Sequence, residues 1–553
     1  MDVRRKGLHG LAALVSAAIL AVLVAGCSGD DGIDGADGQA GTPGTDGISC
    51  WDLNENGVPD LPDEDTNGDG VVNVEDCRAP GGAYDPAGLH AGFFKENPYE
   101  GTQDCLYCHG KIADEILETG HWNWQGVAAN LEGFEAEIHG KNDIINNFCI
   151  AVPSNEGRCT QCHIGYGYAD KTFNFQDPKN IDCLVCHDQS GTYKKAAPSA
   201  GAPDPSVDLQ VVAQSVGEGG GIPTRKACLF CHAQAGGGDN VKHGDLYLQQ
   251  ASTTREYDVH MGVDNAVGGF TCTECHAVKK DADGALTSHG IGGMPYHSVD
   301  EGAMKTCEDC HGSAASVHAG TSAQSMVAAH PALACQVCHI PAIAREKSTK
   351  VEWYWETAGD KTIVPEEDQY GNPLYNWQKG TFVFAKDVRP ELRYFDGKWN
   401  KALIGVNDTF PTTGPAQLAA PTADRFTPGA RIYPFKKMIG NQPVALQGGN
   451  WKFIVPHLFG TAGGPNPYWV ALDWDLALQD GALYTGQFYE PGTYVFAPTE
   501  MLLSVNHEVA PKEMALGYQN GCGDCHFNGQ IDWEALGCTA DPTEVQGACP
   551  DND

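Results

Sequence analysis

The pattern Cys-x-x-Cys-His occurs eight times in this chain of 553 residues. At the observed composition only about 0.03 copies are expected by chance, so the repetition reflects chemistry. Two thiols one helical turn apart reach the two vinyl groups of a haem, and the histidine that follows projects an imidazole at the iron. Zinc ribbons also use Cys-x-x-Cys, but they come in pairs and need no histidine after every second cysteine. The motifs therefore predict eight haem c groups, at Cys105/Cys108/His109, Cys159/Cys162/His163, Cys183/Cys186/His187, Cys228/Cys231/His232, Cys272/Cys275/His276, Cys307/Cys310/His311, Cys335/Cys338/His339 and Cys522/Cys525/His526.

Six of the 22 cysteines lie outside these motifs: Cys27, Cys50, Cys77, Cys149, Cys538 and Cys549. Cys538 and Cys549 lie near the C-terminus and can pair as a disulfide in an oxidising compartment. The first three belong to N-terminal segments with features of their own, so Cys149 is left over. A single remaining thiol in an exported protein is either a sequestered structural residue or a reactive one.

Most electron-transfer haems carry a second axial histidine, so the other histidines matter. Besides the motif residues and His9, eleven remain: His90, His121, His139, His243, His260, His289, His297, His318, His330, His457 and His507. Because supply exceeds demand, the pairing with individual haems cannot be deduced. His90 and His457 lie far from any motif and are interpreted as ordinary polar side chains.

The N-terminus has the pattern of an export signal. Basic residues at positions 4 to 6 precede an uncharged stretch over 11–24, which is too short to span about 30 Å of hydrocarbon. The stretch ends in Leu-Val-Ala-Gly-Cys27, which resembles a bacterial lipobox and predicts cleavage after residue 26 and lipidation of Cys27. A plain secretory signal is the alternative. Ser28 favours an outer-membrane or cell-surface lipoprotein, attached to the membrane only through its lipid anchor.

Residues 27–49 read as a tether. Glycine recurs at every third position from Gly29 to Gly47, the period of a collagen triple helix, but Pro43 is the only proline. A trimerising stalk and a flexible polar tether are both compatible with this pattern. The scarcity of proline favours the tether.

Residues 50–77 contain two consecutive loops with calcium-loop spacing. Each loop has glycine at position 6, Gly57 or Gly70, which permits the sharp turn that brings oxygens together around a hard cation. A solvated acidic linker is the alternative. Cys50 and Cys77 bracket the unit and are expected to form a disulfide. The predicted Ca²⁺ ligands are Asp52, Asn54, Asn56, Asp60 and Asp63 in the first loop, and Asp65, Asn67, Asp69, Asn73 and Asp76 in the second.

Composition limits the remaining classes of function and fold. The formal net charge of −37 argues against nucleic acid and anionic lipid surfaces as partners. The 68 glycines and 32 prolines, with few long amphipathic runs, predict short helices joined by long loops and little strand. With 41% hydrophobic residues and so many cysteines and histidines, we expect haem faces to supply part of the buried surface.

Several stretches around the motifs carry a second pattern. They are Gly120-His121-Trp122-Asn123-Trp124, Asn146-Asn147-Phe148-Cys149-Ile150-Ala151, Asn155-Glu156-Gly157-Arg158, Asp182 before Cys183-Leu184-Val185-Cys186-His187, Asp239-Asn240-Val241-Lys242-His243-Gly244-Asp245, and Cys335-Gln336-Val337-Cys338-His339-Ile340-Pro341. Together they resemble the octahaem tetrathionate reductase family, over about residues 100 to 526. The resemblance implies the multihaem cytochrome c architecture shared with hydroxylamine oxidoreductase and pentahaem nitrite reductase, mainly α with long loops. The small calcium-binding loop module that precedes it here departs from the pattern of that family.

The resemblance also distinguishes one haem from the others. In that family the second haem is the active site, and a lysine amine is its unusual axial ligand. The matching residues here are His163 as proximal ligand and Lys242 as second ligand, with Cys149 and Asp239 close by. A neutral amine coordinates, burial lowers its pKa, and a substrate can displace it. An exposed surface lysine is the alternative for Lys242.

For the other seven haems the resemblance selects seven distal histidines: His121, His243, His260, His289, His318, His330 and His507. His297 and His139 are reserves. The predicted organisation is a haem-rich core over 90–345, an aromatic-rich haem-free region over 346–505, and the eighth haem with a disulfide-bonded tail over 506–553. The aromatic region is expected to cover the core, to shape a substrate funnel or to form a subunit interface.

Two functions follow. The resemblance implies an enzyme that reduces small sulfur or nitrogen species, with tetrathionate, nitrite and hydroxylamine as the family's substrates. The lipid anchor, tether and calcium loops instead favour a cell-surface electron conduit to minerals or partner cytochromes. The expected partners are redox partner cytochromes or quinol-linked electron donors and a small oxyanion substrate. A homo-oligomer is left open, and no nucleic acid is expected.

Overall fold

The computed structural model describes residues 61, 85–276, 289–293 and 304–550. It divides into two units, Met1–Gly82 and Ala83–Asp553. The predicted signal peptide, tether, calcium loops and Cys50–Cys77 disulfide, and the reserve His297, lie outside the described residues. All that follows concerns the second unit.

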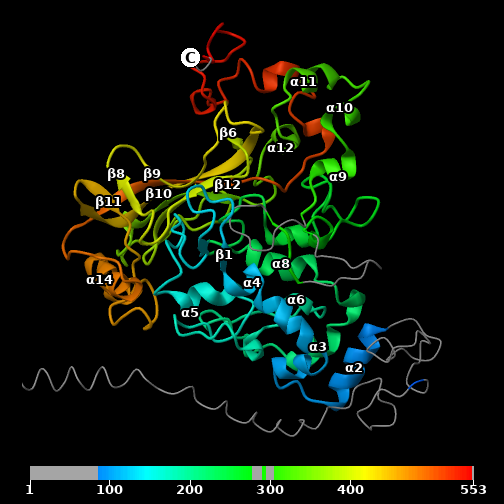
Figure 1. The fold of residues 1–553 in the computed structure, drawn as a ribbon, viewed down its shortest axis with the longest axis vertical. Helices are drawn as coiled ribbons and strands as arrows, with labels where there is room; N and C mark the ends of the chain where they lie inside the picture. Colours follow the sequence, from blue (N-terminus) through cyan, green and yellow to red (C-terminus); the bar gives the residue numbers. More distant parts are fainter. Residues whose placement is uncertain (1–60, 62–84, 277–288, 294–303, 551–553) are drawn as a thin grey trace, which may run out of the picture. The chain divides into compact units, whose positions relative to one another are not determined.

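Short helices make up the part of the chain that carries most of the motifs, with long connections between them (Figure 1). Thr224 caps the helix at residue 225 by accepting a hydrogen bond from Ala227 N at 3.2 Å. The motifs at residues 159, 272 and 522 use 3₁₀ turns over Thr160–Cys162, Cys272–Glu274 and Gly521–Asp524. The helices are α2 (Pro86–Glu96), α3 (Thr102–Leu117), α4 (Gly120–Asn123), α5 (Glu156–Cys159), α6 (Leu184–His187), α7 (Leu209–Ser215), α8 (Arg225–His232), α9 (Cys307–His311), α10 (Ala314–Val317), α11 (Gln324–Ala329), α12 (Cys335–His339), α13 (Tyr468–Ala471) and α14 (Trp474–Thr485).

The Cys-free region forms a ten-stranded sheet, so the expectation of little strand is wrong here. The sheet runs β4-β5-β3-β10-β12-β9-β7, and β6, β8 and β11 join it at its side. Figure 1 shows β6 and β8 to β12 drawn together. The strands are β3 (Thr349–Tyr354), β4 (Tyr375–Asn376), β5 (Gly380–Ala385), β6 (Glu391–Phe395), β7 (Trp399–Lys401), β8 (Thr409–Pro411), β9 (Ala416–Pro421), β10 (Arg431–Gln447), β11 (Asn450–Lys452) and β12 (Tyr494–Ser504), while β1 (Gln125–Val127) and β2 (Ile138–Gly140) form a separate pair.

The long strand β10 organises this sheet. It pairs antiparallel with β12 from Phe435↔Ser504 to Ala445↔Tyr494, and parallel with β3 around Gly440↔Trp353. β-branched and aromatic side chains favour strands because they pack on a pleated surface. The expectation of little strand is wrong because it was based on the glycine and proline content of the whole chain, which does not show that β-branched and aromatic side chains gather in this region.

The largest core cluster lies on the sheet and is aromatic. The rings of Trp353 and Trp355 stack at 4.8 Å, and Trp474 of α14 stacks on Tyr468 of α13 at 3.6 Å. Phe148, next to the unpaired thiol of Cys149, is buried in the same cluster. The sheet is therefore packed directly against the loop that carries Cys149.

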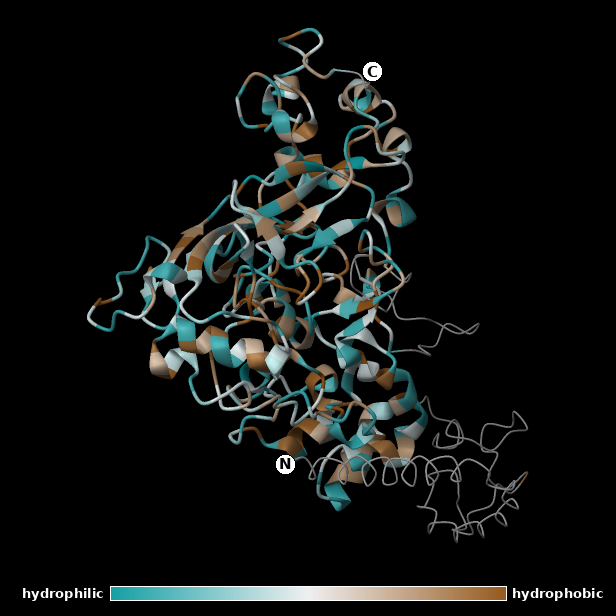
Figure 2. Cartoon of the chain, turned by 60° about the vertical axis from the view of Figure 1, so that its left-hand side comes forward, coloured by the Kyte–Doolittle hydropathy of each residue, from teal (hydrophilic) through white to brown (hydrophobic). Residues whose placement is uncertain are grey.

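No helix within the described part of the chain is long and apolar enough to cross a membrane. Figure 2 shows hydrophilic and hydrophobic residues interspersed along the helices and strands. At the C-terminus a disulfide joins Cys538 and Cys549, the pairing that the cysteine count allows.

Candidate functional site

Seven of the eight motif histidines face a second histidine ring, with ring centroids 6.0 to 6.2 Å apart. Two imidazole rings bound to one iron have their centroids about 6 Å apart, because each metal–nitrogen bond is about 2 Å long and each ring centre lies about 1 Å beyond its nitrogen. Each pair therefore fits one haem iron. The pairs are His109 with His90, His187 with His289, His232 with His121, His276 with His507, His311 with His260, His339 with His318, and His526 with His330.

Hydrogen bonds fix the orientation of many of these rings. Three distal rings use their Nδ1 to donate to the carbonyl oxygen four residues earlier, at 2.7 to 2.8 Å: His90, His318 and His330. On the proximal side, Nδ1 of His187 and of His276 donates to the carbonyl oxygens of Gly221 and Gly292 at 2.8 and 2.7 Å. When Nδ1 carries the proton, Nε2 keeps its lone pair for a metal.

The motif cysteines differ in their exposure to solvent. Cys310 is exposed on α9, a helix without any buried residue. Its thiol lies close to Cys275 of the preceding motif. The exposed motif cysteines are Cys108, Cys275, Cys307, Cys310 and Cys522.

The structure shows which of the predicted distal histidines face a motif histidine and which do not. Six of the seven predicted residues face a motif histidine: His121, His260, His289, His318, His330 and His507. Among the described residues no motif histidine ring faces the seventh, His243. His90 instead faces His109 and completes the set of seven pairs. The interpretation of His90 as an ordinary side chain is therefore wrong. Asp85 and Pro86, a helix-start signal, place His90 one turn inside α2 and were the available clue.

The two other histidines have different partners. His139 lies between the carboxylates of Asp143 and Glu137, at 2.6 and 3.2 Å. His457 is fully buried, with its ring nitrogens 2.8 Å from Ser154 O and 3.2 Å from Gly460 O. Neither faces a motif histidine in the described part of the chain.

His163 differs from the other motif histidines. It is buried, and within the described ranges no histidine ring faces it. Its Nε2 lies 2.6 Å from Trp122 O, and its Nδ1 is buried without a hydrogen-bond partner. Burial lowers its pKa to about 3, which keeps the imidazole neutral, with its proton on Nε2 towards Trp122 O. Five aromatic rings surround it at 5.0 to 5.9 Å: Trp122, Trp124, Tyr168, Phe173 and Phe175.

A buried ion pair fixes the backbone at His163. The Lys195 ammonium donates to His163 O at 2.6 Å and lies 3.1 Å from the Asp182 carboxylate, and both of these charged side chains are fully buried. Asp182 N in turn donates to Ile164 O at 2.8 Å. Because Asp182 directly precedes Cys183, the pair joins the second motif to the third.

Lys242 lies on the loop after α8, close to the motif of His163. Burial lowers the pKa of Lys242 to about 8, and Lys141 and Cys162 are the charged groups that act on its amine. The Cys149 thiol is close to both Cys159 and Lys350. Lys242 and Cys149 therefore both lie near the cysteines of the second motif, as the resemblance implies.

Asp239 occupies a different position from the one expected. Its carboxylate accepts a hydrogen bond from Leu248 N at 2.8 Å, and Lys347 supplies the nearest positive charge. Burial raises the pKa of Asp239. Its described partners do not include Lys242, so a direct role of Asp239 at the amine stays a prediction.

Further lysines surround this centre, and sequence reasoning missed them. Within the described ranges, no carboxylate forms an ion pair with Lys141, Lys350 or Lys379, although Lys350 is only 4% exposed. Burial lowers the pKa of Lys350 to about 7. These three ammonium groups, and that of Lys401, lie over aromatic rings: Lys141 over Trp124 at 3.9 Å, Lys350 over Phe382 at 3.5 Å, Lys379 over Trp469 at 5.7 Å and Lys401 over Trp399 at 4.3 Å.

Contacts between cysteines of different motifs show how the motifs follow one another in space. Numbered along the chain, motif 1 contacts 3, motif 3 lies near 4, motif 4 contacts 5, and 5, 6, 7 and 8 continue in order. Motif 2, that of His163, contacts motif 4 through Cys162 and Cys231. The seven motifs with facing histidines thus form a continuous row, and the lysine-lined centre branches from it.

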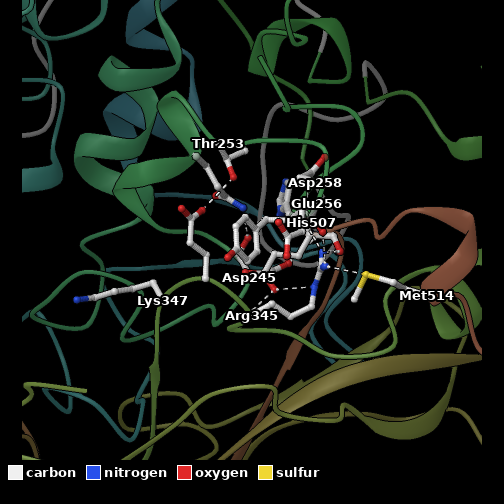
Figure 3. A network of polar contacts seen from close by, with 12 residues as sticks. Asp245, Thr253, Glu256, Asp258, Arg345, Lys347, His507 and Met514 are labelled. Atoms are coloured by element: carbon white, nitrogen blue, oxygen red, sulfur yellow. Dashed lines mark hydrogen bonds and ion pairs between the residues drawn. The ribbon is translucent and has the colours of Figure 1, made fainter. Parts of the chain in front are cut away.

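A buried polar network supports two of the distal histidines (Figure 3). The Asp245 carboxylate accepts hydrogen bonds from His507 N at 2.9 Å and from His507 Nδ1 at 3.2 Å. Asp258 accepts from His260 N at 2.8 Å and from Glu508 N at 2.8 Å. Arg345 donates to Glu508 O at 2.8 Å and reaches Met514 across the network.

We expect Asp245→Asn to raise the reduction potential of the haem held by His276 and His507. The Asp245 carboxylate makes the His507 imidazole a more basic ligand and stabilises ferric iron, and the amide loses that charge. Spectroelectrochemical titration measures the shift, and Asp424→Asn at the surface is the control. An unchanged set of potentials would contradict this role of Asp245.

Comparisons with known proteins agree with this geometry. Residues 350–529 match the family model described as "Cytochrome c bacterial". An uncharacterized protein of Archaeoglobus fulgidus is 25% identical over 32% of this chain and 73% of its own length. The crystal structure of octahaem cytochrome c from Shewanella oneidensis is 36% identical, with a TM-score of 0.69 over 83% of this chain and 99% of that one.

The motifs, the facing histidines and these matches define a multihaem c-type cytochrome. The chain belongs to the family of the Shewanella octahaem cytochrome c, the octahaem tetrathionate reductase family. The multihaem cytochrome architecture expected from the sequence is confirmed, with the large sheet as an addition to it.

Proposed function

We propose that this protein is an oxidoreductase that reduces small sulfur or nitrogen oxyanions at the centre formed by His163 and Lys242. The observation that carries the proposal is the difference between His163 and the other seven motif histidines. Seven have a histidine opposite, whereas His163 has an amine, a thiol and several ammonium groups around its motif. Such a centre leaves room for chemistry that a bis-histidine site excludes.

Eight haem c groups would be held by the sixteen motif cysteines and eight motif histidines. Their second ligands would be His90, His121, His260, His289, His318, His330 and His507, and Lys242 at His163. When bound, the haems store and pass on electrons, and one of them offers the substrate an iron. The row of adjacent motifs supports electron delivery through motif 4 to the His163 centre.

The charge around the centre favours an anionic substrate over neutral hydroxylamine. Arg158 and Lys379 both lie over the ring of Trp469, at 5.1 and 5.7 Å, and Trp469 Nε1 is buried without an acceptor in the described part of the chain. Lys379 Nζ and Cys149 Sγ each lie 3.9 Å from the place where a side chain on Gly237 would begin. Two cations and an N–H donor next to the thiol suit the sulfonate oxygens of tetrathionate.

Cys149 is suited to attack a sulfur substrate. As a thiolate it would bond to an inner sulfur of tetrathionate and release one thiosulfate, leaving a Cys–S–S–sulfonate on the protein. Two electrons would then break the new sulfur–sulfur bond, release a second thiosulfate and restore the thiolate. Lys350 lies close to this thiol.

We expect Lys379→Met to raise KM for tetrathionate by roughly tenfold, the effect of losing one charge-assisted hydrogen bond. The kcat value and the turnover of uncharged hydroxylamine should change little, because the reacting groups stay in place. Steady-state kinetics with both substrates test this, and Lys361→Met, at the exposed end of the same region, is the matched control. Equal losses with both substrates would show that Lys379 does not select for charge.

A second candidate function is an electron conduit at the cell surface. The continuous row of seven motifs favours it, because the row connects motif 1 to motif 8 without passing the His163 centre. Rapid reduction of ferric oxide by a wild-type protein that turns over none of tetrathionate, nitrite and hydroxylamine would establish the conduit and exclude the reductase.

We propose further that the protein is exported as a lipoprotein anchored through Cys27 at the outer membrane or cell surface, with Ca²⁺ bound in the loops of residues 50–77. Partner cytochromes or quinol-linked donors would supply its electrons. The N-terminal sequence supports this placement, and loss of labelled fatty acid from a Cys27→Ala variant tests the anchor.

A further inference from the structure

The Lys436 side chain, on β10, makes three hydrogen bonds in the interior of the protein. Its ammonium donates to Val241 O at 2.7 Å, to Lys242 O at 3.0 Å and to Thr349 Oγ1 at 2.7 Å. The Thr349 hydroxyl uses its own proton on Asn240 O at 2.6 Å, so towards Lys436 it accepts. The three N–H bonds of an ammonium thus meet three acceptors, and two of these belong to the Lys242 segment.

This arrangement is costly for stability alone. Lys436 is fully buried. Among the described residues it forms no ion pair. A buried charge without an ionic partner disfavours folding, and an apolar side chain of similar length would fill the same space. The three hydrogen bonds of its amine therefore indicate a task beyond packing.

The segment that Lys436 contacts begins and ends in left-handed backbone, which is strained at Asn240 and accessible to glycine at Gly244. Asn240 has a φ of 59° and Gly244 a φ of 84°, both in the left-handed region. A Cβ on Gly244 would lie 2.8 Å from Lys436 Cδ, so the strand residue and the loop approach closely. Asn240 Nδ2 also donates to Lys347 O at 2.6 Å. Left-handed conformations of non-glycine residues persist only where surrounding contacts enforce them.

We propose that Lys436 is a positioning residue that holds the backbone of Lys242 so that its amine is presented to the His163 centre; this rests on the proposed function. Because Lys436 binds the carbonyl oxygens and not the amine, the Lys242 side chain is free to leave when a substrate displaces it and to return afterwards. The Cys-free sheet then has a function in addition to covering the haems: it supplies the support for the active-site lysine.

The test compares Lys436→Met and Thr349→Val with Lys437→Met. Lys437 is the next residue on β10, points to the other face of the strand and pairs with Glu391 at 3.0 Å, so it matches the change in charge and size without touching the loop. For each variant we would measure haem content, the near-infrared magnetic circular dichroism of the His/Lys-ligated haem, and azide binding to the oxidised protein.

With all eight haems retained, Lys436→Met should weaken the His/Lys signal and raise the affinity for azide by roughly tenfold, as expected for lost hydrogen bonds from a charged group. Thr349→Val should shift both in the same direction by less, and Lys437→Met should match wild type. If Lys436→Met does not assemble, Thr349→Val decides. Unchanged signal and azide affinity in these variants would overturn the positioning role, whereas a wild-type protein without any His/Lys signal would overturn the proposed function on which it rests.

Discussion

Replacing Lys242 with alanine is expected to lower turnover of tetrathionate and nitrite by roughly 100-fold or more, while all eight haems and rapid electron uptake are retained. Changes near a metal centre commonly reduce activity by about 10- to 100-fold, and removing a ligand itself should reach at least the upper end of this range. Burial lowers the pKa of the Lys242 amine to about 8, so the amine loses its proton at little cost in free energy near neutral pH and can then bind a metal. A substrate can displace this amine for a similarly small cost in free energy.

The control for Lys242→Ala is Lys398→Ala. Lys398 is about half exposed and pairs with Glu135 at the surface, at 3.8 Å. The Lys398→Ala substitution removes the same positive charge without affecting the centre. Wild-type turnover in Lys242→Ala would show that the chemistry takes place elsewhere.

The second large effect is expected at Cys149. Cys149→Ala should lower tetrathionate turnover by roughly 1,000-fold or more, in line with the loss of a nucleophile that acts together with its neighbours. Nitrite, which has no sulfur to attack, should keep most of its turnover. Cys149→Ser preserves the shape of the side chain and should lose tetrathionate turnover as well, because a hydroxyl is a far weaker nucleophile at neutral pH.

Parallel kinetics with the two substrates separate chemistry from packing. Phe148 belongs to the main core cluster, and Cys149 packs against that cluster. A structural loss would therefore reduce both activities together and bring down the unfolding temperature. Wild-type turnover of tetrathionate in both Cys149→Ala and Cys149→Ser would contradict a covalent role of Cys149.

The sequence was sufficient to predict the haem motifs, because each motif is a local pattern with a chemical requirement of its own. Distal ligands have no fixed spacing from their motifs. His507 lies 231 residues after His276, and only the folded chain brings their rings to 6.1 Å. His90 was missed because family-like context near a motif was given more weight than the helix start before it.

The lysines around the centre show a second limit. Lys350 and Lys379 lie in or beside strands of the Cys-free sheet, far in sequence from Cys149, and nothing local marks them. Their positions result from pairing between β3 and β5, which carries both chain segments to the same place. Lys436 lies on β10 of the same sheet, and it reaches the Lys242 segment through long-range packing as well. Long-range strand pairing of this kind is set by tertiary packing, which a single sequence shows only weakly.

Near-infrared magnetic circular dichroism of the fully oxidised wild-type protein tests the central claim most directly, because its charge-transfer bands distinguish bis-histidine haems from histidine/lysine haems. We predict the bands of seven bis-histidine haems and one histidine/lysine haem, with the latter alone lost in Lys242→Ala. A spectrum with eight bis-histidine haems would contradict the assignment of His163 and Lys242 as the reactive centre.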